Sequence, residues 1–69
     1  MNSRIESRKK RYLPGIRVRL IRMDDRQAPP PGTEGTVLGV DDIGSIMVAW
    51  DTGSSLNVLM DIDAVEVIR

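Results

Sequence analysis

The chain has 69 residues, ten basic and ten acidic side chains, and neither cysteine nor histidine. This length allows one small domain near the lower limit for independent folding, and the composition excludes a disulfide framework and a zinc site. There is no signal-peptide pattern and no apolar run of about 20 residues, so we expect a soluble, cytoplasmic protein stabilised by packing.

The zero net charge hides a strong separation of charge along the chain. Residues 1–26 carry nine of the ten basic side chains against three acidic ones, which gives a net charge of +6. Residues 27–69 carry one basic side chain against seven acidic ones, which gives −6. Such a chain can hold a polyanion at its basic end, or its two halves can pair with each other.

The first predicted element is a helix over residues 3–12. Ser3 and Glu6 have the spacing of a capping box, and the basic residues that follow suit the negative end of the helix macrodipole. Ile5 and Tyr12 would share the face that packs on the rest of the protein. Pro14-Gly15 ends the helix. We therefore expect residues 1–13 to form a basic N-terminal helix or arm.

From residue 14 onward, short β-branched runs alternate with turn signals, which is typical of strands. The predicted strands are residues 16–20, 36–40, 45–50, 56–58 and 65–68. A stiff proline-containing loop over 24–32 follows the first, and a helical turn over 61–64 precedes the last. This pattern predicts a mainly β fold, a small five-stranded SH3-like barrel over residues 14–69 with a short N-terminal α-helix.

Alternation along these strands predicts one buried cluster. Its expected members are Ile16, Val18, Leu20, Val37, Ile46, Val48, Trp50, Leu56, Val58, Val65 and Val67. Gly35 and Gly39 are candidate sites for a bulge or a close backbone approach.

Several runs of residues also resemble one known family. They are GIRVRL at 15–20, QAPPPGT at 27–33, GTV at 35–37, WD at 50–51 and GSSL at 53–56. Together they resemble the bacterial and phage family called domain of unknown function 4314. This resemblance implies a small domain, often carried on mobile elements, with no assigned activity. A local similarity to Mind bomb-type repeats, which are peptide-binding SH3-like modules, rests on Val48, Trp50, Asp51 and Gly53.

The residues offer little for catalysis or metal binding. The serines have no histidine or other evident base beside them, so they are poor nucleophiles. Three aspartate pairs could share a proton or hold a hard cation: Asp24 with Asp25, Asp41 with Asp42, and Asp61 with Asp63. All three fall where turns are expected, and aspartate favours turns by bonding its own backbone. We expect that turn role, with no cofactor and no metal.

The two aromatic residues and the prolines have structural and functional interpretations. Trp50 could stack on a ligand, but its position in a strand beside Ile46 and Val48 favours the core. The run Pro29-Pro30-Pro31 could be a ligand for another protein's groove, or it could stiffen its loop. With Tyr12 and Trp50 as the only aromatics, a groove that binds proline-rich peptides is disfavoured.

The basic residues could form a stripe that neutralises phosphates. Arg17 and Arg19 share one side of the first strand, and we expect an open positive patch centred on them and Arg22. In the alternative interpretation, the basic residues lie on a solvated strand face and on a helix paired with the acidic half. The candidate binding surface comprises Arg8, Arg11, Arg17, Arg19, Arg22, Pro30 and Pro31.

Three functional hypotheses follow. The first is a non-enzymatic module that binds a protein through the long loop and the adjacent sheet surface. The second is weak electrostatic binding of nucleic acid through the basic N-terminal third. The third is an enzyme or metal protein that uses the aspartate pairs. No membrane partner is expected, and self-association stays open.

Overall fold

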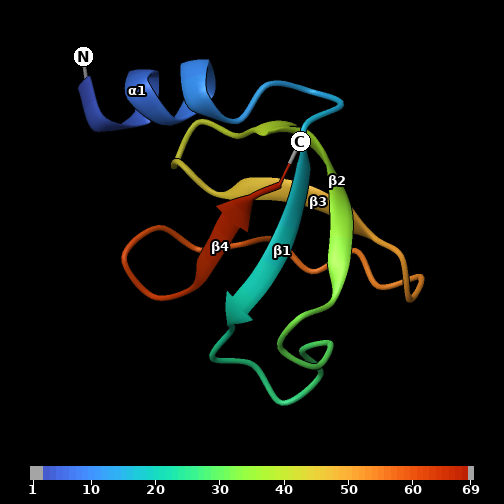
Figure 1. Ribbon diagram of the computed structural model, residues 1–69. Helices are drawn as coiled ribbons and strands as arrows, with labels where there is room; N and C mark the ends of the chain where they lie inside the picture. The colour runs from blue at the N-terminus through green and yellow to red at the C-terminus, as the bar shows by residue number, and fades with distance from the viewer. Residues whose placement is uncertain (1–2, 69) are drawn as a thin grey trace.

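The computed structural model describes residues 3–68 and contains one helix and four strands (Figure 1). The elements are α1 (Ser3–Arg11), β1 (Arg17–Arg22), β2 (Glu34–Val40), β3 (Ile46–Trp50) and β4 (Ala64–Val67). The strands form one antiparallel sheet in the order β3-β2-β1-β4. The expected mainly β fold with a short N-terminal helix is confirmed. Over the described residues, however, the sheet has four strands rather than five and is open between β3 and β4.

The predicted strand at residues 56–58 is reduced to a single bridge. Val58 N–H donates to Ile46 O at 2.8 Å, and Ile46 N–H donates to Val58 O at 2.9 Å. The segment before this bridge is held by Trp50, whose indole Nε1–H donates to Leu56 O at 2.9 Å. Trp50 therefore takes a carbonyl that a continuous ladder would have used. The expected helical turn is a turn at residues 60–62, and β4 begins at Ala64.

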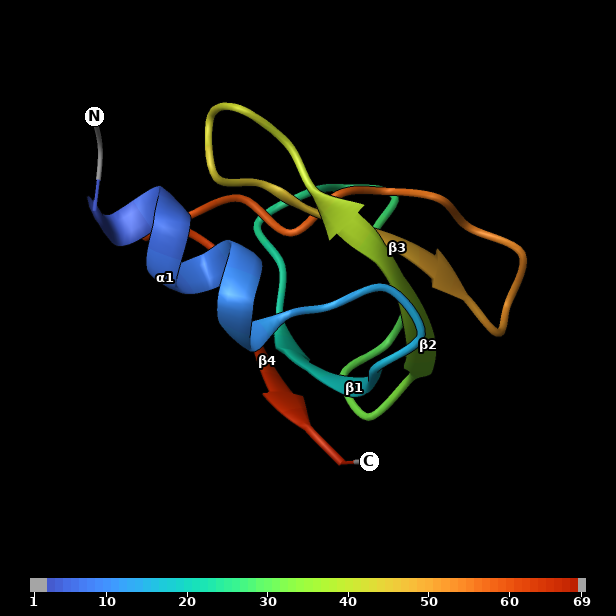
Figure 2. The same cartoon turned by 90° about the horizontal axis from the view of Figure 1, so that it is seen from above.

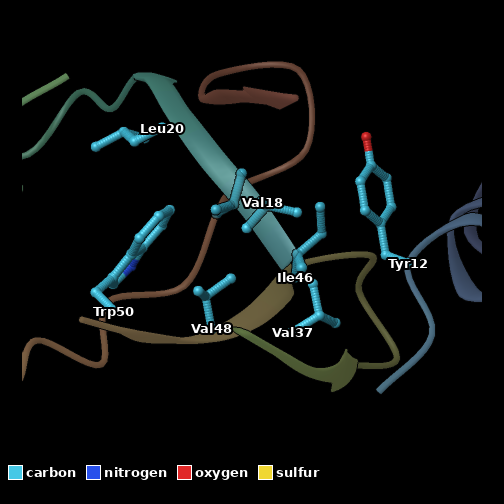
Figure 3. Close-up of a cluster of buried hydrophobic side chains, with 8 residues drawn as sticks. Tyr12, Val18, Leu20, Val37, Ile46, Val48 and Trp50 are labelled. Carbon is cyan, nitrogen blue, oxygen red and sulfur yellow. The ribbon is translucent and has the colours of Figure 1, made fainter. Parts of the chain in front are cut away.

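One cluster of buried side chains lies on the inner face of the sheet. Figure 3 shows Trp50 at one end of this cluster and Tyr12 at the other, with the aliphatic side chains between them. Its members are Tyr12, Val18, Leu20, Val37, Ile46, Val48, Trp50 and Val58. Ile16 and Val65 pack partly against it, whereas Leu56 is half-buried. The prediction for Val67 was wrong, since its side chain is 43% exposed in the edge strand β4.

Gly35 permits the close approach of β2 to β3 that this core requires. A Cβ atom at this position would lie 2.7 Å from Val48 Cγ1 and 2.9 Å from both Ala49 O and Trp50 Cε3. Any larger residue would push the two strands apart. Gly39 lies at the register shift in the β2–β3 ladder, so the expected roles of both glycines are confirmed.

The helix α1 lies over one end of the sheet, and the loop after β1 lies at the other (Figures 1 and 2). Arg8 Nε–H donates to Gly44 O at 2.7 Å, which joins α1 to the β2–β3 turn. Tyr12, one residue beyond the helix, is 7% exposed and anchors it in the core, as expected. Within residues 3–68, no helix has the length and hydropathy needed to cross a membrane.

Candidate interaction surface

The outer face of the sheet carries a ladder of alternating charges. Because Val18 and Leu20 point into the core, Arg17 and Arg19, which alternate with them along β1, point outward. Arg17 makes a two-pronged contact with Asp51, through Nη1–Oδ1 at 2.9 Å and Nη2–Oδ2 at 2.6 Å. It also donates to Thr36 Oγ1 at 3.0 Å, across the β1–β2 pair. With a longer hydrogen bond to Glu34 Oε1 at 3.4 Å, the planar guanidinium group is held by four oxygen acceptors.

Arg19 continues the ladder towards β4. The strand register places it opposite Glu34 on one side and Glu66 on the other. Its Nη1 lies 2.9 Å from Glu66 Oε1, and its Nη2 lies 3.7 Å from Glu34 Oε2. Arg17 Nη2 lies 3.4 Å from Glu34 Oε1, so Glu34 joins the two arginines. We call Asp51, Arg17, Glu34, Arg19 and Glu66 the charge ladder; it carries three negative charges and two positive ones.

The contact between Arg17 and Asp51 shifts the titration of both groups. The hydrogen bond from Arg17 lowers the pKa of the Asp51 carboxyl below its usual value. The same hydrogen bond is the main cause of the raised pKa of Arg17, with a further contribution from Glu34. Both side chains therefore stay ionised and paired at neutral pH.

The open positive patch that we expected is wrong at its centre, because Arg17 and Arg19 are paired with carboxylates. Pairing extends to the helix, where Arg4 contacts Asp61 and Lys9 Nζ lies 3.6 Å from Asp42 Oδ1. These contacts join the basic and acidic halves of the chain, as the alternative interpretation proposed. The fold brings the halves together because β1 lies between β2 and β4.

The remaining basic candidates are dispersed. Arg8 and Arg11 lie against the Tyr12 ring, each with its guanidinium carbon 5.6 Å from the ring centroid. Arg22 is exposed at the end of β1, and Arg26 is exposed in the following loop. Neither has an ion pair with a carboxylate of residues 3–68. The structure therefore separates Arg8 and Arg11 on α1 from Arg22 at the opposite end of the sheet.

The loop at residues 23–33 is held by its own hydrogen bonds. Gly32 N–H donates to Leu20 O at 2.7 Å, and Thr33 Oγ1–H donates to Pro30 O at 2.7 Å. Pro29 is buried, whereas Pro30 and Pro31 are exposed. The expected proline-containing loop is therefore present, closed by hydrogen bonds, and it exposes two prolines.

The aspartate pairs have the turn role that the sequence predicted. Asp25 Oδ1 accepts from Gln27 N–H at 2.8 Å, and Asp41 Oδ1 accepts from Ser45 N–H at 2.9 Å. Asp63 accepts through both carboxylate oxygens, from Leu59 N–H and from Asp24 N–H, each at 2.9 Å. Asp63 thereby ties the loop after β1 to the turn before β4. Among residues 3–68, no group of three or more acidic side chains is placed to hold a metal ion.

Sequence reasoning missed the acidic members of the ladder. Glu34 and Thr36 alternate with buried Gly35 and Val37, which is a signal that they share the outer face of β2. Their pairing with Arg17 and Arg19 additionally requires the strand register, which no local pattern supplies.

Comparison with protein families identifies a family that the chain matches over nearly its whole length. The family model described as "Domain of unknown function (DUF4314)" matches residues 1–68. A comparison with curated proteins gave no match.

Proposed function

The chain belongs to the family described as domain of unknown function 4314, and we propose that it is a small, non-enzymatic binding module whose partner is a protein. Family membership brings no activity with it, so this proposal depends on the surface of the molecule.

The observation that carries the proposal is the fixed, exposed proline loop. Pro30 and Pro31 project from a loop fastened at both ends, by Gly32 to Leu20 O and by the main chain of Asp24 to Asp63. A surface already held in one conformation loses little entropy on binding. Prolines also offer apolar contact area without rotatable side chains. Arg22 at the start of this loop and Arg26 within it have no ion pair with a carboxylate of residues 3–68, and they could add charge complementarity to an acidic partner.

The charge ladder favours a protein over a nucleic acid as the partner. Phosphate binding requires basic side chains that can exchange counterions for phosphates. Arg17 and Arg19 already contact three carboxylates, so they would have to break these contacts first. Both aromatic side chains are buried, which leaves no exposed aromatic ring among residues 3–68 for base stacking.

The proposal includes an SH3-like architecture. Residues 56–58 lie beside β3 through the Ile46–Val58 bridge, so a fifth strand there would follow β3 in the sheet. Trp50, the centre of the similarity to Mind bomb-type repeats, is buried. Val48 is buried as well, whereas Asp51 and Gly53 are exposed, so the similarity supports no aromatic binding groove.

A site-specific crosslinking experiment tests the proposal. A photoreactive amino acid is placed at Pro31 or at Arg26, and, as a matched control, at the exposed Lys10 on α1 at the other end of the sheet. In the native cells, we expect both loop positions to yield the same discrete protein adduct and Lys10 to yield none. Adducts of nucleic acid, equal labelling from Lys10, or no adduct from the loop would contradict the proposal.

A further inference from the structure

The two edge strands of the sheet, β3 and β4, differ in whether another segment bonds to their outer side. On the outer side of β3, residues 54–58 form backbone hydrogen bonds with the strand. They do so through the Ile46–Val58 bridge and through Trp50 N–H, which donates to Ser54 O at 3.0 Å. Beside β4, no backbone hydrogen bond of this kind is present among residues 3–68, and α1 packs against β2. Figure 1 shows β4 as the last strand on its side of the sheet.

The ladder between β1 and β4 determines which backbone groups face outward at this edge. Ile68 N–H donates to Arg17 O at 2.9 Å, and Arg19 lies opposite Glu66. Because hydrogen-bonded and non-bonded pairs alternate in an antiparallel ladder, Glu66 and Ile68 bond to β1. The N–H and C=O groups of Val65 and Val67 therefore point away from the sheet. Outside the ladder itself, no backbone group of residues 3–68 forms a hydrogen bond with them.

We propose that the outer edge of β4 accepts an extended segment of a partner protein as an added strand. Two donors and two acceptors, at Val65 and Val67, would pair with the backbone of that segment. The proposal rests on the proposed function in taking a protein as the partner, but it uses a surface other than the loop at 23–33.

The charge ladder specifies the side chain that the added segment presents on the outer face. In strand order, Glu34 on β2, Arg19 on β1 and Glu66 on β4 alternate in sign. Glu66 ends this row with its side chain 49% exposed. Opposite charges in cross-strand pairs stabilise a sheet, so the next position favours lysine or arginine.

The neighbouring positions of the segment face the inner side of the sheet. They lie opposite Val65, which packs partly against the core, and Val67, which is 43% exposed. Apolar β-branched side chains there would cover Val67 and extend the core. The segment that fits is therefore apolar, basic and apolar at three successive positions.

A second copy of the chain fits this edge less well. Antiparallel pairing of two β4 strands that uses all the free groups of Val65 and Val67 places Glu66 opposite its own symmetry mate. That pair is a non-hydrogen-bonded one, in which side chains lie closest. Like charges in this position are destabilising.

A peptide titration followed by NMR tests the proposal. The probe is the end-blocked peptide TVKVT, added to the isotopically labelled full chain, with TVEVT as its charge-reversed twin. We expect saturable shifts centred on the amides of Val65 and Val67 and slower hydrogen exchange at both. TVEVT should bind about two- to fivefold more weakly, since a cross-strand charge pair is worth a fraction of a kcal/mol.

Two variants at one position supply the control. Val67→Pro removes an N–H that points away from the sheet, a position that proline tolerates in edge strands, and it should abolish binding. Val67→Thr keeps that N–H and should bind as the unchanged protein does.

Shifts centred away from β4, equal binding by Val67→Pro, or no shift at millimolar peptide would overturn the proposal. A dimer of the free chain that Val67→Pro dissolves would assign the edge to a second copy and overturn it too. Crosslinking at Pro31 does not depend on this edge, so failure here is distinguishable from failure of the loop proposal.

Discussion

Trp50 contributes to the fold through both its ring and its indole N–H. The ring is 3% exposed, and Nε1–H fixes Leu56 O at 2.9 Å, so the side chain positions the segment that covers β3. Tyr12 is buried too, at the other end of the core. Both aromatic side chains are thus engaged in the fold, and the binding surfaces that we propose consist of prolines, charged side chains and main chain.

Val48 tests the inner face of the sheet. Its side chain is 1% exposed, and Val48→Ala should lower the free energy of unfolding by about 2 kcal/mol, because the cavity adds to the lost transfer energy. Urea unfolding measures the change. Leu38→Ala is the control, since that side chain is 58% exposed and should cost about 0.5 kcal/mol or less. An unchanged midpoint for Val48→Ala would contradict the inward position of this residue.

Asp51 links the charge ladder to pH. Arg17 lowers the pKa of the Asp51 carboxyl in the folded state, whereas the ordinary pKa of 3.8 applies in the unfolded state. The folded state therefore binds this proton less readily than the unfolded state does. The resulting stabilisation is complete well above pH 3.8 and is lost as pH falls through the folded pKa. We expect Asp51→Asn to lower stability at pH 7 and to flatten the loss of stability in acid, measured by urea midpoints from neutral to acid pH. Asp42→Asn, at a fully exposed carboxylate, should leave the profile unchanged. A steeper acid limb in Asp51→Asn would contradict the assignment.

At the scale of the elements, the local sequence pattern was enough to predict most of the strands and turns. β1, β2 and β3 lie where β-branched alternation predicted them, and the aspartate turns follow from side chains bonding their own backbone. The strand expected at 56–58 was not predictable as a bridge, because its path depends on the Trp50 indole. The pairing of Arg19 was also beyond local pattern, since it requires residues 34 and 66 to come together across β1.

The helix α1 gives the element-scale prediction. Tyr12 holds it to the sheet, with Arg8 and Arg11 against the ring. Tyr12→Ala should cost about 3 kcal/mol, as expected for a buried aromatic side chain, and detach the helix. Circular dichroism and urea unfolding measure both effects. Lys10→Ala, on the exposed side of α1, is the control and should change stability by less than about 0.5 kcal/mol. Unchanged stability in Tyr12→Ala would mean that residues 3–11 are an independent arm.

For the whole molecule, the sheet order resolves the charge separation of the chain. The basic strand β1 lies between two strands that carry acidic residues, and the basic helix lies beside acidic turns. Exposed ion pairs contribute about 0–1 kcal/mol each to stability. Their main effect is therefore to reduce the positive electrostatic potential at the surface. Arg22 and Arg26, at the start of the proline loop and within it, have no ion pair with a carboxylate in the described part of the chain, and a protein partner is proposed there.

The most direct test of this account is a fluorescence titration of a labelled 20-base-pair DNA and a matched RNA at physiological salt. Because carboxylates of the same molecule pair with the basic side chains, we expect nucleic acid to bind only at the weak end of nonspecific affinities. The dissociation constants should lie above about 10⁻⁴ M. Arg17→Gln and Arg19→Gln should leave that result unchanged, because each arginine would have to leave its carboxylate partners to reach a phosphate. Submicromolar binding that weakens steeply with salt and is lost in these variants would contradict the account and make the domain a polyanion binder.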